Sequence, residues 1–238
     1  IDSSENVTIG GTLSGTTATF TTADNTDTLT LKSTDADANT GPTLFMQRDS
    51  ASPADGDSIG KISFVGDNDA GEATRFARID NQISDASDGT EDALMFITTM
   101  VNGAETSRIT LQPTETVFNE ESADLDFRVE GNNNTHALFV QGGSDGVGIG
   151  QPSPNSFNQY ADNLVVGTTS GENGITIATG TGNSARFVFS DNSNSSNDAF
   201  VGAIEYSHSS NSMMFYNSGT QRMVIASNGS VTVDGSFA

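Results

Sequence analysis

The chain has 238 residues, of which 31 are acidic and 9 are basic, so its formal charge at pH 7 is −22. An acidic chain repels phosphate backbones, which excludes nucleic-acid binding, and the longest apolar run, 93–97, is far too short for the ~18–20 residues of a membrane helix. The absence of Cys excludes disulfides, thiolate catalysis and sulfur-ligated metals.

Along the chain, short runs alternate apolar with polar side chains, which is the period-2 pattern of strands buried on one face. These runs are 6–13, 27–33, 61–66, 125–131, 146–150, 174–179, 186–190, 202–207, 222–227 and 230–235. Between them stand turn-forming pairs such as Asn102-Gly103, Ser218-Gly219 and Asn228-Gly229, which supply the positive φ of tight hairpins. Almost no segment has helical spacing. The sequence therefore predicts an all-β fold of strands about five residues long.

The chain also repeats itself, because 43–64 aligns with 185–206 without a gap. The best matches are Phe45 with Phe187, Asp49 with Asp191, Ile59 with Val201, Gly60 with Gly202, Ile62 with Ile204 and Phe64 with Tyr206. Two copies of one β-module are therefore expected.

The likeness continues after a gap. Met95-Phe96 matches Met214-Phe215, and the arginine-containing segments 107–111 and 221–225 match each other. The first copy has an insertion over about 70–92, in which 75–80 predicts one added strand.

These observations predict four parts and an assembly. The parts are a β-strand leader (1–40), a first β-module (41–112), a connector with a VGIG motif (113–171), and a second β-module with a C-terminal strand (172–238). A single sheet of this size with few large apolar side chains exposes too much apolar surface to be stable alone. The simplest way to cover this apolar surface is to pack identical chains against one another about a rotation axis. Since the chain begins at Ile1 and shows no signal peptide, we expect it to be a fragment of a longer protein.

No catalytic, cofactor-binding or metal-ligating residue is assigned. His136 and His208 form no metal-ligand pair, and either is a hydrogen-bonded strand or turn residue, the alternative being an ion site shared with symmetry copies. Segment 67–72 resembles the start of a calcium loop, but Glu72 arrives too early, which favours a solvated hairpin tip.

Arginine is the other notable residue type. Arg108 and Arg222 occupy equivalent positions in the two modules, and Arg128 lies at a similar strand start. The planar guanidinium suits bidentate pairing at interfaces. We hypothesise that Arg108 and Arg222 form buried or interchain ion pairs that fix subunit register, the alternative being exposed strand arginines.

Three segments resemble bacteriophage tail fibre and tail-spike proteins, particularly those of marine phages. Segment 126–154 is similar to the fibre pattern that ends in VGIG-x-x-SP, and 202–225 is similar to the unit G-x-I-x-Y-x-H…M-x-F…R-M-x-I. The first module, from 48 to 103, resembles another unit of these proteins. The resemblance implies homotrimers elongated along a threefold axis, with strands intertwined or stacked. Many members also carry a C-terminal self-cleaving chaperone; because the sequence stops at 230–238 without one, we expect either that it was removed or that assembly takes another route.

The VGIG glycines fit that picture, because Gly146, Gly148 and Gly150 would let three backbones approach an axis while Val147 and Ile149 fill a shared core. The alternative is a bulged turn within one chain.

The expected function is that of a virion structural protein without enzymatic activity, extracellular on the phage tail or another fibre. Its partners would be copies of itself in a homotrimer, other tail or baseplate proteins, and a host-surface glycan or protein, with no nucleic acid and no membrane insertion. Candidate contact loops are 49–58, 66–72 and 190–198. Alternatives are a polysaccharide-depolymerising spike, for which the carboxylates are abundant but Trp is absent, and a prokaryotic surface adhesin or filament subunit.

Overall fold

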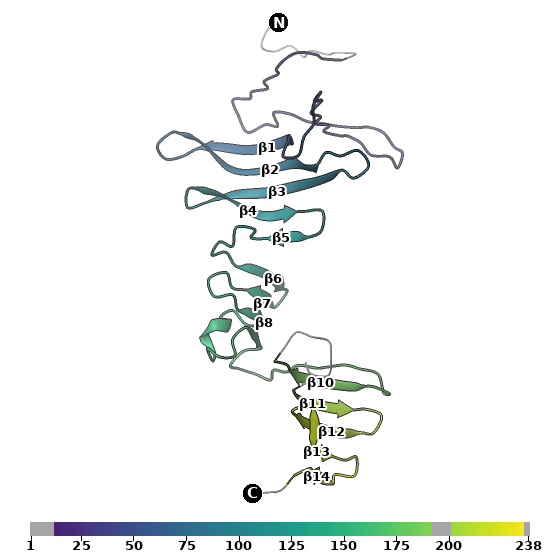
Figure 1. Cartoon of the computed structure of the whole chain (residues 1–238). Coiled ribbons are helices and arrows are strands. Elements are labelled where there is room, and N and C mark those ends of the chain that lie inside the picture. Colours follow the sequence, from purple (N-terminus) through teal and green to yellow (C-terminus); the bar gives the residue numbers. More distant parts are fainter. Residues whose placement is uncertain (1–11, 192–200, 236–238) are drawn as a thin grey trace. The chain divides into compact units, whose positions relative to one another are not determined.

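The structure is a computed structural model, and it describes residues 12–191 and 201–235 (Figure 1). The chain divides into two units, Ile1–Glu121 and Ser122–Ala238, which we describe separately. In the described part, the regular elements are strands and one 3₁₀ turn, arranged in three sheets. The all-β prediction is therefore confirmed.

The first unit contains a five-stranded antiparallel sheet in which each strand pairs with the next. Its strands are β1 (Ser58–Asp67), β2 (Ala73–Asp85), β3 (Asp92–Val101), β4 (Ala104–Leu111) and β5 (Thr116–Phe118). The added strand predicted at 75–80 lies within β2, which is 13 residues long. Strands β1–β4 have 8 to 13 residues and are longer than the expected five. The strands continue past the apolar runs into polar residues, which the apolar pattern does not mark as strand.

The second unit begins with a four-stranded sheet inside the predicted connector. Its strands are β6 (Phe127–Gly131), β7 (Asn134–Val140), β8 (Val147–Ile149) and β9 (Leu164–Val166). Strands β8 and β9 are parallel, and the crossover between them contains the 3₁₀ turn η1 (Pro154–Ser156). This crossover covers one face, where Phe139, Val165 and Pro154 form a small core.

The last sheet is again a five-stranded antiparallel meander. Its strands are β10 (Ser184–Phe189), β11 (Gly202–Ser207), β12 (Ser212–Asn217), β13 (Thr220–Ile225) and β14 (Val231–Val233).

Tight turns join the strands as predicted. The β3–β4 hairpin turns through Asn102 and Gly103, with φ of 48° and 82°, and β12–β13 turns through Ser218 and Gly219, with φ of 52° and 65°. Both central residues have the positive φ of a type I′ turn, whose twist matches that of the paired strands.

Two predicted strands are wrong. The segment 27–33 and the segment 174–179 contain no strand, and neither does any other residue from 12 to 57, so the predicted β-strand leader has none in its described part. Residues 6–11 lie outside the described residues. Alternation favours an extended backbone, but a strand also needs a hydrogen-bonding partner, and the described chain provides none for these segments.

The two five-stranded sheets share a β-bulge at the same place. The register between β3 and β4 shifts immediately after Ile97↔Ile109, and that between β12 and β13 shifts immediately after Phe215↔Met223. The extra residue in the bulge is an arginine in both sheets, as described below. A bulge adds one residue to one strand and increases the local twist.

This register corrects one detail of the repeat alignment. Because Ile109 is equivalent to Met223, the partner of Ile109, Ile97, is equivalent to Phe215. The match of Phe96 with Phe215 is therefore displaced by one residue, which places the two side chains on opposite faces of their sheets.

Candidate functional site

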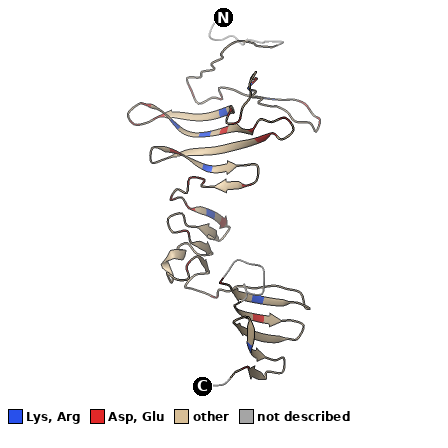
Figure 2. Cartoon of the chain, viewed as in Figure 1, with Lys and Arg blue, Asp and Glu red and all other residues tan. Residues whose placement is uncertain are grey.

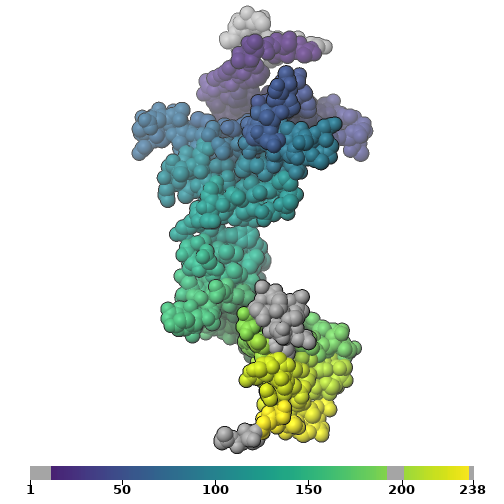
Figure 3. Space-filling view, in the orientation of Figure 1, coloured from purple at the N-terminus to yellow at the C-terminus, as the bar shows by residue number. Residues whose placement is uncertain are grey.

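The first sheet has one apolar face. A row of cross-strand neighbours on this face runs through all five strands: Ile62, Ile79, Ile97, Ile109 and Phe118. Phe64, Met95 and Leu111 flank the row and are exposed. In the space-filling view, blue atoms of the segment before β1 lie in front of part of this unit, and the teal strands are visible beside and below them (Figure 3).

The last sheet has an equivalent row. Successive cross-strand partners are Phe187, Ile204, Phe215, Met223 and Val233. The next row on the same face contains Tyr206, Met213 and Ile225. Aromatic and aliphatic cross-strand pairs stabilise a sheet, but here several remain exposed within the single chain.

The four-stranded sheet is apolar on the face opposite its small core. The side chains of one row are Phe127, Val140, Val147 and Leu164, and Val129, Leu138, Ile149 and Val166 occupy the neighbouring positions. Val129, Ile149 and Leu164 are exposed. We call these three surfaces the apolar faces.

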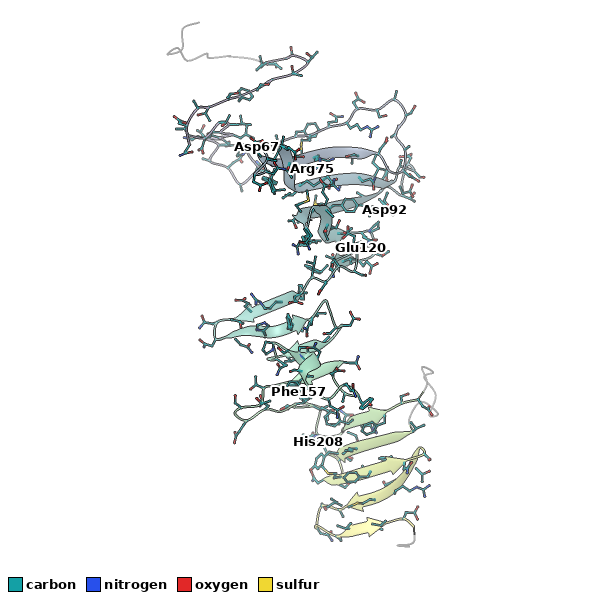
Figure 4. The ribbon with its side chains drawn as sticks, turned by 90° about the vertical axis from the view of Figure 1, so that its left-hand side faces the viewer. Asp67, Arg75, Asp92, Glu120, Phe157 and His208 are labelled. Atoms are coloured by element: carbon teal, nitrogen blue, oxygen red, sulfur yellow. The ribbon has the colours of Figure 1, made fainter. Side chains whose placement is uncertain are left out.

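The opposite face of the first sheet is polar and charged. The Glu105 carboxylate accepts from Arg75 at 2.6 Å and from Arg78 Nη1 at 2.7 Å, so one acid on β4 holds two arginines on β2. In Figure 4, Asp67 and Arg75 lie together at the end of the sheet where β1 turns into β2. The groups are partly exposed, so their pairing contributes at most about 1 kcal/mol per pair.

The last sheet has a corresponding ion pair on its polar face. Arg186 Nε donates to Glu205 Oε2 at 2.7 Å, and the two residues are cross-strand partners. Figure 2 shows this pair as a blue segment on β10 beside a red one on β11. Glu205 is only 5% exposed. The hydrogen bond from Arg186 lowers the pKa of Glu205, while burial raises the pKa of Tyr216 beside them.

The arginines singled out by the repeat, Arg108 and Arg222, are the extra residues of the two bulges. Their carbonyls accept equivalent hydrogen bonds, from Asn119 N at 3.2 Å and from Asp234 N at 2.8 Å. Arg108 Nε donates to the Thr99 hydroxyl, and Arg222 Nη1 is 3.9 Å from an exposed Asp234 carboxylate. Their equivalence therefore has a backbone origin within the chain. The hypothesis that they form interchain ion pairs stays a prediction.

Arg128, the third arginine of the sequence analysis, pairs with Glu130 at 2.6 Å on β6, where both side chains are about half exposed.

The VGIG glycines are required by contacts within the chain. A Cβ on Gly148 would overlap the Gln151 carbonyl oxygen, and a Cβ on Gly146 would lie 3.0 Å from Pro154. Gly150 has a φ of 68°, which favours glycine. The expectation that these glycines admit the backbones of other chains is therefore corrected: the crossover after β8 occupies that space.

The remaining candidates are structural in the described chain. His136 packs edge-on against Phe139, and His208 packs edge-on against Tyr206. Segment 67–72 forms the β1–β2 hairpin tip, where the Asn68 side chain accepts from Ala70 N and Glu72 N. No group of three or more acidic or histidine side chains among the described residues is placed to hold a metal ion.

Of the three candidate contact loops, 49–58 precedes and enters β1, and 66–72 is the hairpin just described. The third, 190–198, lies outside the described residues from position 192 onward. Residues 45–50 with Pro53, Ile59 and Ile83 line a shallow hollow of about 370 Å³ beside β1. Arg48 pairs with Asp57 across it at 3.0 Å.

Among the residues that the structure describes, no helix combines the length and apolar character needed to cross a membrane. Comparison with known proteins finds no matching family model, no matching curated protein and no matching solved structure.

Proposed function

We propose that the chain is a non-enzymatic segment of a homotrimeric phage tail fibre, whose role is to build the fibre and support attachment to the host surface. The observation that supports this most directly is the set of three apolar faces. Each presents rows of large apolar side chains, several of which remain exposed in the described chain.

The amount of exposed surface supports association with copies of the same chain. Phe64 on the apolar face of the first sheet is 53% exposed, and Phe187 on that of the last sheet is 49% exposed. Burying apolar surface stabilises by about 25 cal/mol per Å². Equivalent chains about an axis would bring like faces together, so each copy would supply the second layer that the others lack.

The charge pattern agrees with this arrangement. The formal charge of −22 makes close contact between exposed acidic surfaces unfavourable. The ion pairs of the first and last sheets lie on the faces opposite the apolar rows, so they would stay outside the interface when the apolar faces pack together.

The mass of the native particle tests the assembly. We expect light scattering or native mass spectrometry to give three times 24.7 kDa at all practical concentrations. A folded particle with the mass of one chain would contradict the proposal.

Antibodies test the location. Antibodies raised against the chain should label fibres on phage particles that encode it and should block their adsorption. Labelling of a cell surface in the absence of phage would instead support the adhesin. Release of new reducing ends from host polysaccharide by the purified protein would support the depolymerising spike.

A further inference from the structure

The polar face of the first sheet is hollowed between β1, β2, β3 and β4. The hollow has a volume of about 340 Å³ and is lined by Ser58, Arg78, Asp80, Gln82, Phe96, Ser107 and Glu121. Its size is at the lower end of the ~300–1,000 Å³ typical of small-molecule pockets.

Strand register places the lining. Asp80 is the cross-strand partner of Phe96. Thr98 is the cross-strand partner of Arg78 on one side and of Ser107 on the other, so the side chains of these five residues project from the same face. These rows adjoin each other along β2 and β3. The hollow is thus built on paired strands rather than on a loop.

Glu121 closes the hollow from outside the sheet. It follows β5, and both of its carboxylate oxygens accept from the backbone N–H of Ser107, at 3.0 and 3.1 Å. Ser107 precedes the bulge residue of β4, where the regular β3–β4 pairing is interrupted. The Ser107 N–H, which lies beyond the part of β4 that pairs with β5, thus anchors Glu121 beside the bulge.

Two buried hydroxyls beside the hollow, those of Thr98 and Thr110, have no hydrogen-bond partner among the described residues, and they stand in the same cross-strand rows as the lining. In the lining, Arg78 Nε and Asp80 Oδ1 make no regular hydrogen bond but form an ion pair with each other. Arg78 Nε and Asp80 Oδ1 are 3.4 Å apart, while Arg78 Nη1 is engaged by Glu105. Thr98 and Thr110 are each only 2% exposed. An unsatisfied buried polar group costs about 1–3 kcal/mol, so such groups usually have a partner in the functioning protein.

The chemistry of the lining selects a class of ligand. Arg78 is a donor, Asp80 and Glu121 are acceptors, and the Ser107 hydroxyl is both. The Gln82 amide nitrogen donates one hydrogen bond to the Gly56 carbonyl at 2.8 Å and has a second N–H. A hydroxyl group also donates and accepts, so a ligand with several hydroxyls matches this mixture. Two carboxylates in the lining and acidic Glu105 on Arg78 disfavour phosphate and other anions. Phe96 adds one apolar surface against which C–H groups can pack.

From this juxtaposition we propose that the hollow binds a neutral sugar residue. The proposal rests on the attachment role proposed above, and it names a site and a ligand class for that role. The hollow lies on the face opposite the row Ile62–Ile79–Ile97–Ile109–Phe118, so it would stay open when the apolar face is covered by other copies.

The site can be tested by titrating the full chain, in its native assembly, with single neutral sugars. The probes are the methyl glycosides of glucose, galactose, mannose and N-acetylglucosamine, and the readout is saturation-transfer NMR with a competition titration. We expect saturable binding of at least one probe and no binding of inorganic phosphate.

Two substitutions locate the binding. Asp80→Asn removes a charged acceptor while keeping the shape of the side chain, and we expect it to weaken binding at least tenfold. Phe96→Leu removes the aromatic surface and should weaken binding severalfold. Met95→Leu is the matched control for Phe96→Leu, because Met95 is the neighbouring residue on the opposite face of the sheet. We expect the Met95→Leu variant to bind the sugar with unchanged affinity. Native mass and melting temperature show whether each variant is folded.

The outcomes separate this inference from the proposed function. If no probe binds to a folded trimer, or if phosphate binds in their place, the sugar site is wrong and the fibre proposal stands. If a sugar binds but the folded variants Asp80→Asn and Phe96→Leu retain full affinity, the hollow is not the site. Sugar binding by a particle with the mass of one chain would support this site and contradict the trimer.

Discussion

At the scale of the residue, the fold depends on a few positions where no other side chain fits. Gly148 is buried in the four-stranded sheet between Phe139 and Val165, and its missing Cβ leaves room for the Gln151 carbonyl oxygen. The side chain of Gln151 then donates to the Gly167 carbonyl at 2.9 Å, which ties the crossover to the end of β9. One glycine therefore allows the crossover to cover the sheet.

Replacing this glycine tests that dependence. We expect Gly148→Ala to destabilise the protein by about 1–3 kcal/mol, because the added methyl group must displace the backbone of Gln151. Gly174→Ala is the matched control, since a Cβ at Gly174 meets nothing within 4 Å. Thermal unfolding followed by circular dichroism measures both, and equal melting temperatures for the two variants would contradict the account.

The buried acid Glu205 predicts a dependence on pH. Its pKa in the folded chain is lowered, chiefly by the hydrogen bond from Arg186, below the ordinary value of 4.5. A group with a lowered folded pKa stabilises the fold above its unfolded pKa, and this contribution is lost as the pH falls through the folded pKa. We expect Glu205→Gln to lower the melting temperature at pH 7. Once the pH is well below 4.5, the melting temperatures of the variant and the unsubstituted protein should be the same. A difference between the two proteins that stays constant from pH 7 to pH 3 would contradict this.

The residue scale also shows where the sequence was informative. The repeat shows that Arg108 and Arg222 are equivalent, because each is followed by two apolar residues that lie on the same face of their sheet. Their position in a bulge could not, because a bulge is a property of the pairing between two strands. The sugar-binding hollow was missed for the same reason: its residues come from four strands and the segment after β5.

At the scale of the element, strand type was predictable and strand pairing was not. The patterns at 61–66 and 202–207 identified β1 and β11, whereas 27–33 has the same alternation but forms no strand in the described chain. Alternation records which side chains will share a face, and it contains no information on whether a partner is present. The connector likewise proved to be a sheet, because its parallel β8–β9 pair depends on a crossover that periodicity does not show.

The bulge in the last sheet permits a test of register. Deleting Arg222 would restore regular pairing, because Tyr216↔Gln221 and Phe215↔Met223 would become consecutive pairs and the apolar row would keep its face. We expect a loss of stability of about 1 kcal/mol, mainly from the backbone bond between Asp234 N and Arg222 O.

Deleting Ala203 provides the control, because it lies in regularly paired β11 between β10 and β12. That deletion moves the side chains on one part of the strand to the other face, so we expect a loss of more than about 3 kcal/mol. Chemical denaturation compares the two deletions. A larger loss for the deletion of Arg222 would show that the bulge, rather than the alternation of faces, determines the register.

At the scale of the whole molecule, the sequence indicated that one chain has too few large apolar side chains to form a core of its own. The structure shows how these side chains are arranged. The apolar side chains are gathered on one face of each sheet instead of being distributed between two layers. Copy number and symmetry are not determined by one chain, because any arrangement that covers these faces satisfies the same requirement.

Two neighbouring residues of β10 allow the apolar faces to be tested as the assembly surface. Phe187 lies on the apolar face and Val188 on the polar face, yet their exposed fractions within one chain are nearly the same, 49% and 50%. If nothing covers either face, Phe187→Glu and Val188→Glu should have similar, small effects. Because we propose that other copies cover the apolar face, we expect Phe187→Glu to bury an unpaired carboxylate and shift the native mass toward one chain. Val188→Glu should leave the mass unchanged, since its carboxylate would remain in solvent. Native mass spectrometry of the two variants at equal concentration makes the comparison, and equal masses would exclude the apolar face of the last sheet from the assembly.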